Sequence, residues 1–300
     1  MIKGLTYFKA RYKVLGLLLF SLVTSFYSYG QETEDDEIDL LLDELFFSED
    51  QFIDDILDLL SKRDFIYTNI SYHSNTYFSG RESNIDQFNL NSQLSFYHRS
   101  GFNLSVSGVY YQEFDPNWDL TNISIGYYDN MGKKNQVQYD IGYTRYIYSD
   151  GWDTFTNSLD ASIGIRNSNR SVGTELSASY LFGNDQSVQL VSGSYYRVTL
   201  ARDQNYVIRF KPQLYFIVAK QTVAFLELDS QGDRVIRFND VFGLLNTQLN
   251  LPISLSTRSW DLELGYNINF PSKVEGESNL NTTGFFSGSI GYLFDFKSHR

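Results

Sequence analysis

The chain has 300 residues, no cysteine and a formal net charge of -12. Without cysteine it can form no disulfide, thiolate metal site or cysteine-linked lipid anchor, and its acidic balance disfavours nucleic-acid binding. A mean hydropathy of -0.30 is too low for a helical membrane protein. The 23 Tyr and 24 Phe, set among many Asn, Ser and Gln, suit a wall with one face in lipid and the other in water.

The N-terminus has the pattern of a secretory signal peptide. A region with three Lys and one Arg precedes an apolar run at 14–26, and small residues follow at 28 and 30. We therefore expect cleavage before Gln31, which removes residues 1–30. The alternative is an uncleaved anchor helix, although an apolar run of about 13 residues is short for a membrane span.

Residues 31–62 carry most of the negative charge of the chain, with thirteen acids and one Lys. Apolar residues recur among these acids at helical spacing, which predicts an acidic amphipathic helical segment on the periplasmic side. Its apolar face could pack on the rim of the following domain, dock a periplasmic or membrane partner, or plug the interior of that domain. The predicted docking face consists of Leu41, Leu42, Leu45, Phe52, Ile53, Ile56 and Leu60.

From residue 63 onward the period of the pattern changes from 3.6 to two. At 260–270, apolar side chains at even positions alternate with polar or small ones at odd positions. A soluble sandwich and a membrane barrel share such alternation, but runs of 10–14 residues favour tilted membrane strands. We predict strands near 65–78, 86–98, 102–114, 119–128, 135–148, 154–166, 171–182, 187–200, 205–219, 243–256, 259–270 and 284–296.

The connections between these strands alternate in character, and the even strand count places both ends of the barrel on the side of the short turns. Longer connections are expected at 220–242 and 271–283. The expected short turns are His98–Gly101, Asp129–Lys134, Asn167–Ser171, Arg202–Asn205 and Thr257–Ser259.

Two prolines interrupt the pattern in the ninth and tenth strands. Pro212 and Pro252 would lie almost opposite each other in a hairpin centred on Gln231 and Gly232. Because proline lacks an N–H, this predicts a bulge or a local opening. The same register predicts a hairpin that projects from the cell surface, with its tip at Asp229–Arg234.

The chain end carries the most specific signal. SIGYLFDF at 289–296 resembles the C-terminal β-signal that the barrel-assembly machinery recognises in outer-membrane barrels, with Gly291, Phe294 and Phe296 at its signal positions. The Tyr- and Asn-rich strands also resemble barrels of Bacteroidota. Together these features predict an all-β, twelve-stranded antiparallel transmembrane β-barrel at 63–300, in the cell outer membrane with both termini periplasmic. Expected partners are membrane lipid, lipopolysaccharide and, during biogenesis, the assembly machinery.

Charged side chains on the inward face are the candidate functional residues. A hairpin symmetric about Asp203 would set Arg197 opposite Arg209, which requires a nearby acid such as Glu175. The charges would either create a transverse field that filters polar solutes or form salt bridges that fill the barrel. They are the bases Arg166, Arg197, Arg209 and Lys211 and the acids Asp140, Asp160, Glu175, Asp261, Glu263 and Asp295, the last three expected across the barrel from the bases.

Catalysis is not expected. His73 points inward with Ser71 and Asn75, but residues two apart on a strand lie roughly 6–7 Å apart, and no G-x-S-x-G elbow is present. No metal site or cofactor is expected. The favoured hypothesis is a passive channel for small polar solutes. The alternative is a non-conducting structural or assembly barrel whose acidic helix docks a partner, and a lipid-modifying enzyme is a third hypothesis.

Overall fold

The computed structural model describes residues 64–296, apart from 79, 83–86, 133–134, 150, 152–153, 229–233 and 275–279. Within strands, the side chains at 78, 81–82, 221–228, 234–241 and 295 are also outside the description. The predicted signal peptide, the acidic helix with its docking face, and residues 297–300 therefore lie outside the described residues. Within the described part of the chain, no helix is long and apolar enough to cross a membrane.

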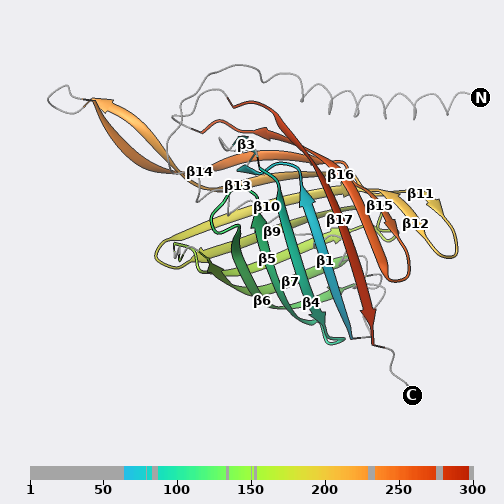
Figure 1. The fold of residues 1–300 in the computed structure, drawn as a ribbon. Helices are drawn as coiled ribbons and strands as arrows, with labels where there is room; N and C mark the ends of the chain where they lie inside the picture. Colours follow the sequence, from blue (N-terminus) through green and yellow to red (C-terminus); the bar gives the residue numbers. More distant parts are fainter. Residues whose placement is uncertain are drawn as a thin grey trace, which may run out of the picture.

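The described elements are all β-strands, as the period of two predicts (Figure 1). They are β1 (Phe65–His73), β2 (Tyr77–Phe78), β3 (Arg81–Glu82), β4 (Asn89–Tyr97), β5 (Phe102–Tyr111), β6 (Trp118–Met131), β7 (Val137–Tyr148), β8 (Asn157–Arg166), β9 (Val172–Phe182), β10 (Gln186–Tyr196), β11 (Val198–Arg202), β12 (Val207–Phe210), β13 (Gln213–Leu228), β14 (Arg234–Asn250), β15 (Ile253–Ser256), β16 (Trp260–Pro271) and β17 (Thr283–Asp295).

These strands form one closed antiparallel barrel. Successive wall strands pair with their neighbours, and β17 pairs with both β16 and β1, which closes the sheet. Three wall strands consist of two segments each: β10 with β11, β12 with β13, and β14 with β15. The wall therefore has twelve strands, which confirms the predicted number. The short β2–β3 hairpin lies in the first connection and forms a separate two-stranded sheet.

The two ends of the barrel differ in their connections. We call the end with the turns at 98–101, 132–136, 167–171, 203–206 and 257–259 the short-turn end, and the opposite end the long-loop end. Two of these turns begin slightly later than predicted, because β6 and β11 continue further. Phe65 pairs with Asp295, so the barrel begins and finishes at the short-turn end, as the even strand count predicts.

Strands β13 and β14 form a ribbon that projects from the long-loop end (Figure 1). Pairing of β13 with β10 stops at Ala219, and pairing of β14 with β16 stops at Asn246. Beyond these residues the two strands pair only with each other, up to Leu228 and Arg234. This confirms the predicted hairpin, although most of the expected loop at 220–242 is strand. Most of the predicted tip, at 229–233, lies outside the described residues.

The wall strands break at the two prolines. Lys211 and Pro212 separate β12 from β13, and Leu251 and Pro252 separate β14 from β15. The register on either side sets these two breaks opposite each other, which confirms the predicted interruption of both strands at the prolines. The carbonyl of each proline still accepts a backbone hydrogen bond. The hydrogen bonds lost at the breaks are therefore those that the missing proline N–H groups would have donated.

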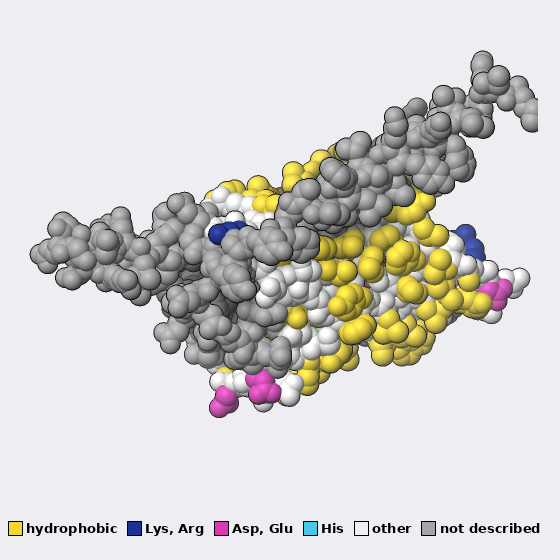
Figure 2. Space-filling model, turned by 90° about the horizontal axis from the view of Figure 1, so that it is seen from above, with side chains coloured by type: hydrophobic (Ala, Val, Ile, Leu, Met, Phe, Trp, Pro, Cys, Tyr) yellow, Lys and Arg dark blue, Asp and Glu magenta, His cyan; other side chains and the backbone are white. Residues whose placement is uncertain are grey.

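Side chains divide between the two faces of the wall as the alternation predicts. Outward apolar residues such as Leu176 and Leu264 are 51% and 73% exposed, whereas inward polar residues such as Asn69 and Ser158 are buried. Figure 2 shows hydrophobic side chains over the described wall and charged ones toward its ends. This arrangement reverses that of a soluble barrel, and it suits a wall that lies in lipid.

The lipid-facing wall makes a depth-dependent prediction for β9. Leu176→Arg, in the middle of the strand, should destabilise the barrel in a bilayer by about 2–4 kcal/mol, whereas Val172→Arg, at its first residue, should cost about 0–1 kcal/mol. Both native side chains face outward. Guanidinium unfolding in lipid vesicles measures both variants. Equal losses of unfolding free energy in the two variants would contradict the placement of this strand across the bilayer.

Glycines on the inward face make room for tyrosine rings on neighbouring strands. A Cβ atom at Gly173 would lie 2.5 Å from the Tyr195 ring, and one at Gly193 would lie 2.7 Å from the Tyr215 ring. A Cβ atom at Gly291 would overlap Tyr67 across the closing β1–β17 pair, 2.7 Å from its Cζ atom. Because real Cβ atoms do not approach ring atoms so closely, larger residues at these positions would displace the rings.

Candidate functional site

The candidate site is a cavity of about 350 Å³ inside the barrel. The inward faces of β4 to β10 and the first residues of β13 form its wall. It extends from Tyr97 and Arg166, near the short-turn end, to Val109 and Tyr146, near the long-loop end. Most inward side chains that line it carry hydroxyl, amide or charged groups, so the cavity suits a polar solute or water.

An aromatic cluster borders the cavity toward the long-loop end. Its members are inward residues at the long-loop ends of β5, β6, β7 and β9, together with one residue of the β7–β8 connection. Tyr146, Val109 and Leu120 belong both to the cluster and to the cavity wall, and the Tyr148 hydroxyl donates to the Phe155 carbonyl at 2.8 Å. The complete cluster consists of Val109, Tyr111, Leu120, Tyr146, Tyr148, Phe155 and Leu181, with Phe114 packed against it.

The first connection covers another part of the same end. The Asn89 side-chain amide donates to the Thr76 hydroxyl at 3.0 Å, and the Tyr77 hydroxyl donates to the Gly284 carbonyl at 3.3 Å. Further along, the Thr283 hydroxyl donates to the Gly80 carbonyl at 3.0 Å. These bonds hold the described residues of this connection against β17, across the seam of the barrel.

Two of the three predicted acids on the cavity wall are held by neutral donors. Asp160 accepts hydrogen bonds from the hydroxyls of Ser158 and Ser179, at 2.7 and 2.6 Å. Glu175 accepts from the Gln138 amide at 3.0 Å and from the Ser177 hydroxyl at 3.1 Å. Charge-assisted bonds of this kind stabilise a carboxylate without a cation.

The two predicted bases on the cavity wall are directed away from these acids. Arg166 is buried, and its guanidinium donates to the Asn135 carbonyl at 2.9 Å and to Asn130 Oδ1 at 3.0 Å, both beside the β6–β7 turn. Lys211 Nζ lies 4.6 Å from the centroid of the Tyr195 ring and interacts electrostatically with Glu263. The cavity therefore presents carboxylates and bases on different parts of its wall.

The structure brings together only part of the predicted set of lumen charges. Asp140, Asp160, Glu175, Arg166 and Lys211 line the cavity. The other predicted residues lie outside the cavity lining. Arg197 donates to the Asn169 carbonyl at 3.4 Å, and Arg209 pairs with Thr199 and Ser254 in the strand ladder. Asp261 accepts from the Ser256 hydroxyl at 2.6 Å, Glu263 lies near Lys211, and the Asp295 side chain is outside the description.

Two predicted arrangements of these charges are wrong. Arg197 does not face Arg209, because Arg209 pairs with Thr199 and the turn lies at Asp203–Tyr206 rather than symmetrically about Asp203. The acids of β16 do not lie across the barrel from Arg209 and Lys211 either. A single strand, β15, separates β12 from β16, which brings Glu263 to the same side as Lys211.

His73 occupies a packing position rather than a catalytic one. Its Nδ1 atom lies 3.0 Å from Asn89 Oδ1, and since that oxygen accepts, Nδ1 carries the proton in this arrangement. Its ring meets the Phe285 ring edge-on, with centroids 5.5 Å apart. The inward placement of His73 with Ser71, predicted from alternation, agrees with the register of β1.

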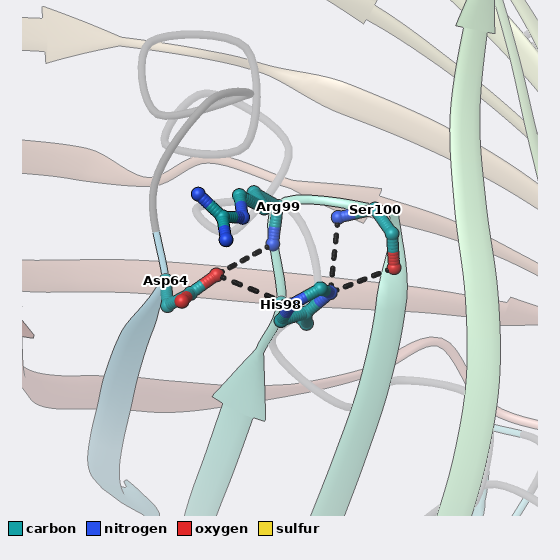
Figure 3. A network of polar contacts seen from close by, with 4 residues as sticks. All are labelled: Asp64, His98, Arg99 and Ser100. Atoms are coloured by element: carbon teal, nitrogen blue, oxygen red, sulfur yellow. Dashed lines mark hydrogen bonds and ion pairs between the residues drawn. The ribbon is translucent and has the colours of Figure 1, made fainter.

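A Ser–His–Asp group at the short-turn end was not anticipated from the sequence (Figure 3). Ser100 Oγ lies 2.8 Å from His98 Nδ1, and Asp64 Oδ1 lies 3.7 Å from His98 Nε2. The Ser100 backbone N–H also donates to Nδ1, so the nitrogen lone pair that would take the serine proton is shared. Asp64 is engaged by the Arg99 backbone N–H at 3.0 Å. These contacts join the start of β1 to the β4–β5 turn, and the group lies apart from the residues that line the cavity.

The three predicted signal residues lie at or beside the closing strand. Gly291 faces inward under Tyr67, whereas Phe294 and Phe296 are exposed on the outside. The Phe294 ring meets the Tyr292 ring at 4.5 Å, and Tyr292 meets Trp260 at 4.6 Å. Phe294 thus belongs, with Tyr292 and Trp260, to an outward aromatic row at the short-turn end, where rings are typical of the membrane interface.

No protein-family model matches the chain, and no curated protein matches its sequence. Similar solved structures include the translocator domain of the autotransporter NalP from Neisseria meningitidis, 12% identical over 87% of this chain and 98% of that one, with a TM-score of 0.47. The KdgM porin is 11% identical over 78% and 99%, with a TM-score of 0.43, and LpxR from Salmonella typhimurium is 9% identical over 76% and 100%, with a TM-score of 0.42.

The geometry of this chain defines its class independently of those likenesses. It is a closed antiparallel barrel with an even number of strands, an apolar outer wall and a polar interior. Only a closed barrel satisfies all backbone hydrogen bonds of strands in lipid. The chain is therefore a β-barrel of the outer-membrane type.

Proposed function

We propose that this barrel is a channel that lets small polar solutes cross the outer membrane. The cavity of about 350 Å³ supports this, because hydroxyl, amide and charged groups line it along most of the barrel. A barrel with a purely structural role has no need of a polar space in its interior. We also propose that the short-turn end and both termini face the periplasm, in line with the signal-peptide pattern and the C-terminal signal.

The aromatic cluster would form the narrowest part of such a channel. Its side chains meet the far end of the cavity, so solutes pass only when these rings move. We therefore expect brief openings of low conductance rather than the steady current of a wide pore. Solutes would enter from the short-turn end, where the cavity reaches Tyr97 and Arg166.

Current through planar bilayers tests this function. The purified mature chain should give discrete openings in concentrated KCl, and a variant that lacks residues 31–62 should do the same. Openings that occur only in the deletion variant would assign residues 31–62 as a plug. A complete lack of current in both proteins would contradict the channel.

The second candidate function is that of a non-conducting structural or assembly barrel. One observation favours it: the aromatic cluster and the first connection both cover the long-loop end. In this case the acidic segment at 31–62 would act by docking a periplasmic or membrane partner, as its sequence suggests. Silence in the bilayer experiment would support this second candidate over the channel.

A further inference from the structure

Three hydroxyl groups of the cavity wall bond to one carboxylate. Ser158 and Ser179 donate to Asp160, and Thr144 also bonds to it. Since the Ser158 proton is given to Asp160, the Tyr146 hydroxyl must donate to Ser158 Oγ, 2.9 Å away. The hydroxyl protons of this network are therefore used in bonds within the wall. The hydroxyl oxygens can then act toward a solute in the cavity only as hydrogen-bond acceptors.

Asp160 and Glu175 have no cation bonded to them among the described residues. Asp160 and Glu175 have only hydroxyl and amide donors as hydrogen-bond partners there. Arg166 is committed to oxygen atoms beside the β6–β7 turn, and Lys211 lies over Tyr195 near Glu263. A positively charged solute would meet these carboxylates without displacing an ion pair.

Two amide oxygens on the cavity wall also lack a partner in the described part of the chain. Asn91 Oδ1 and Asn122 Oδ1 are both buried without a hydrogen bond, and both residues line the cavity. A buried acceptor without a donor is costly, so a ligand donor that reached either oxygen after a change of its side-chain rotamer would relieve that cost. These oxygens belong to β4 and β6, whereas Asp160 and Glu175 belong to β8 and β9.

We propose that the lumen cavity selects small cations that carry hydrogen-bond donors, which bind beside Asp160 and Glu175 with Asn91 and Asn122 as further acceptors. The proposal deepens the channel function by naming its substrate class. An inorganic cation such as K⁺ and an organic amine share the required charge. An amine also supplies N–H donors that match the unpartnered oxygens, so organic amines are the preferred ligands.

Ion selectivity gives the first test. In planar bilayers with a tenfold KCl gradient, the reversal potential should show a preference for K⁺ over Cl⁻ of about threefold or more. Asp160→Asn with Glu175→Gln should bring this ratio close to one. The matched control, Asp185→Asn with Asp203→Asn, removes the same charge from exposed positions outside the cavity and should leave the ratio unchanged. An unselective or anion-selective wild-type channel would overturn the proposal while leaving the channel function intact.

Binding without transport gives the second test. Isothermal titration calorimetry of the detergent-purified protein compares 1,3-diaminopropane, which is a dication, with the neutral 1,3-propanediol of equal length. The diamine should bind about tenfold or more tightly than the diol, and the Asp160→Asn, Glu175→Gln variant should lose this difference. Diamine binding by a barrel that conducts no current would refute the proposed channel function but support the proposed cation site. Equal affinities for diamine and diol, with no K⁺ preference, would refute the cation site.

Discussion

Gly291→Val is expected to prevent the barrel from closing. The new side chain would overlap the Tyr67 ring across the β1–β17 pair. Tyr67 is 2% exposed, so its ring has little space in which to move. Overpacking of a tight interior commonly costs about 1–3 kcal/mol and occasionally more, and here the cost falls on the pair that closes the sheet. The measurement is the fraction of heat-modifiable, protease-resistant barrel after refolding in detergent.

The control variant is Gly142→Ala, an inward glycine on β7. A Cβ atom there would meet its nearest neighbour at 3.5 Å, which is ordinary contact, so refolding should match the wild type. Refolding of the purified protein in detergent takes place without the assembly machinery. It therefore measures the effect of the substitution on packing separately from its effect on recognition by that machinery. Normal refolding of Gly291→Val in detergent, with failed assembly in cells, would assign Gly291 to the signal and contradict the packing explanation.

Leu120→Ala combined with Tyr146→Ala should open the long-loop end of the cavity. Both residues are almost completely buried in the aromatic cluster, at 0% and 4% exposure. Removing them should raise single-channel conductance several-fold. The same truncations should lower stability, by about 2–5 kcal/mol for the leucine and about 3–5 kcal/mol for the aromatic residue. Bilayer recordings measure the first effect, and guanidinium unfolding in vesicles measures the second.

Tyr143→Ala is the matched control for the cluster variant. Tyr143 lies on the same strand as Tyr146, but it faces outward, so its loss should leave conductance unchanged. An equal rise in conductance for both would show that the barrel as a whole has loosened. Unchanged conductance in the cluster variant, beside a conducting wild type, would place the narrowest part elsewhere.

The wall was largely predictable because alternation and strand length are local properties. The faces of 260–270, the projecting ribbon and the paired proline breaks all follow from parity and a hairpin register. The exact register of the strand pairs was harder to predict from the sequence. The ribbon has a bulge between Ile217 and Val218, and the β11–β12 hairpin has an irregularity between Thr199 and Ala201. Each adds a residue to one strand only, and periodicity cannot locate such an insertion before the partner strand is known.

The candidate site was less predictable than the wall. Alternation placed Asp160 and Glu175 on the inward face, but their partners are serine hydroxyls and a glutamine amide on the same or nearby strands rather than the expected bases. The aromatic cluster also escaped sequence reasoning, although the signal was present. Tyr111, Tyr146 and Tyr148 occupy inward positions near strand ends, where a water-filled pore would favour polar residues. Large rings at such positions indicate that part of the interior is filled.

The seam between β1 and β17 has a consequence for folding kinetics. Phe65 pairs with Asp295, so these contacts join the two most distant parts of the barrel sequence. Contacts of such separation form slowly, since the chain between them must first be ordered. Until the last strand arrives, the growing sheet exposes two unpaired edges that invite aggregation. The seam is therefore both the final step of folding and the point at which an incomplete chain most needs a chaperone.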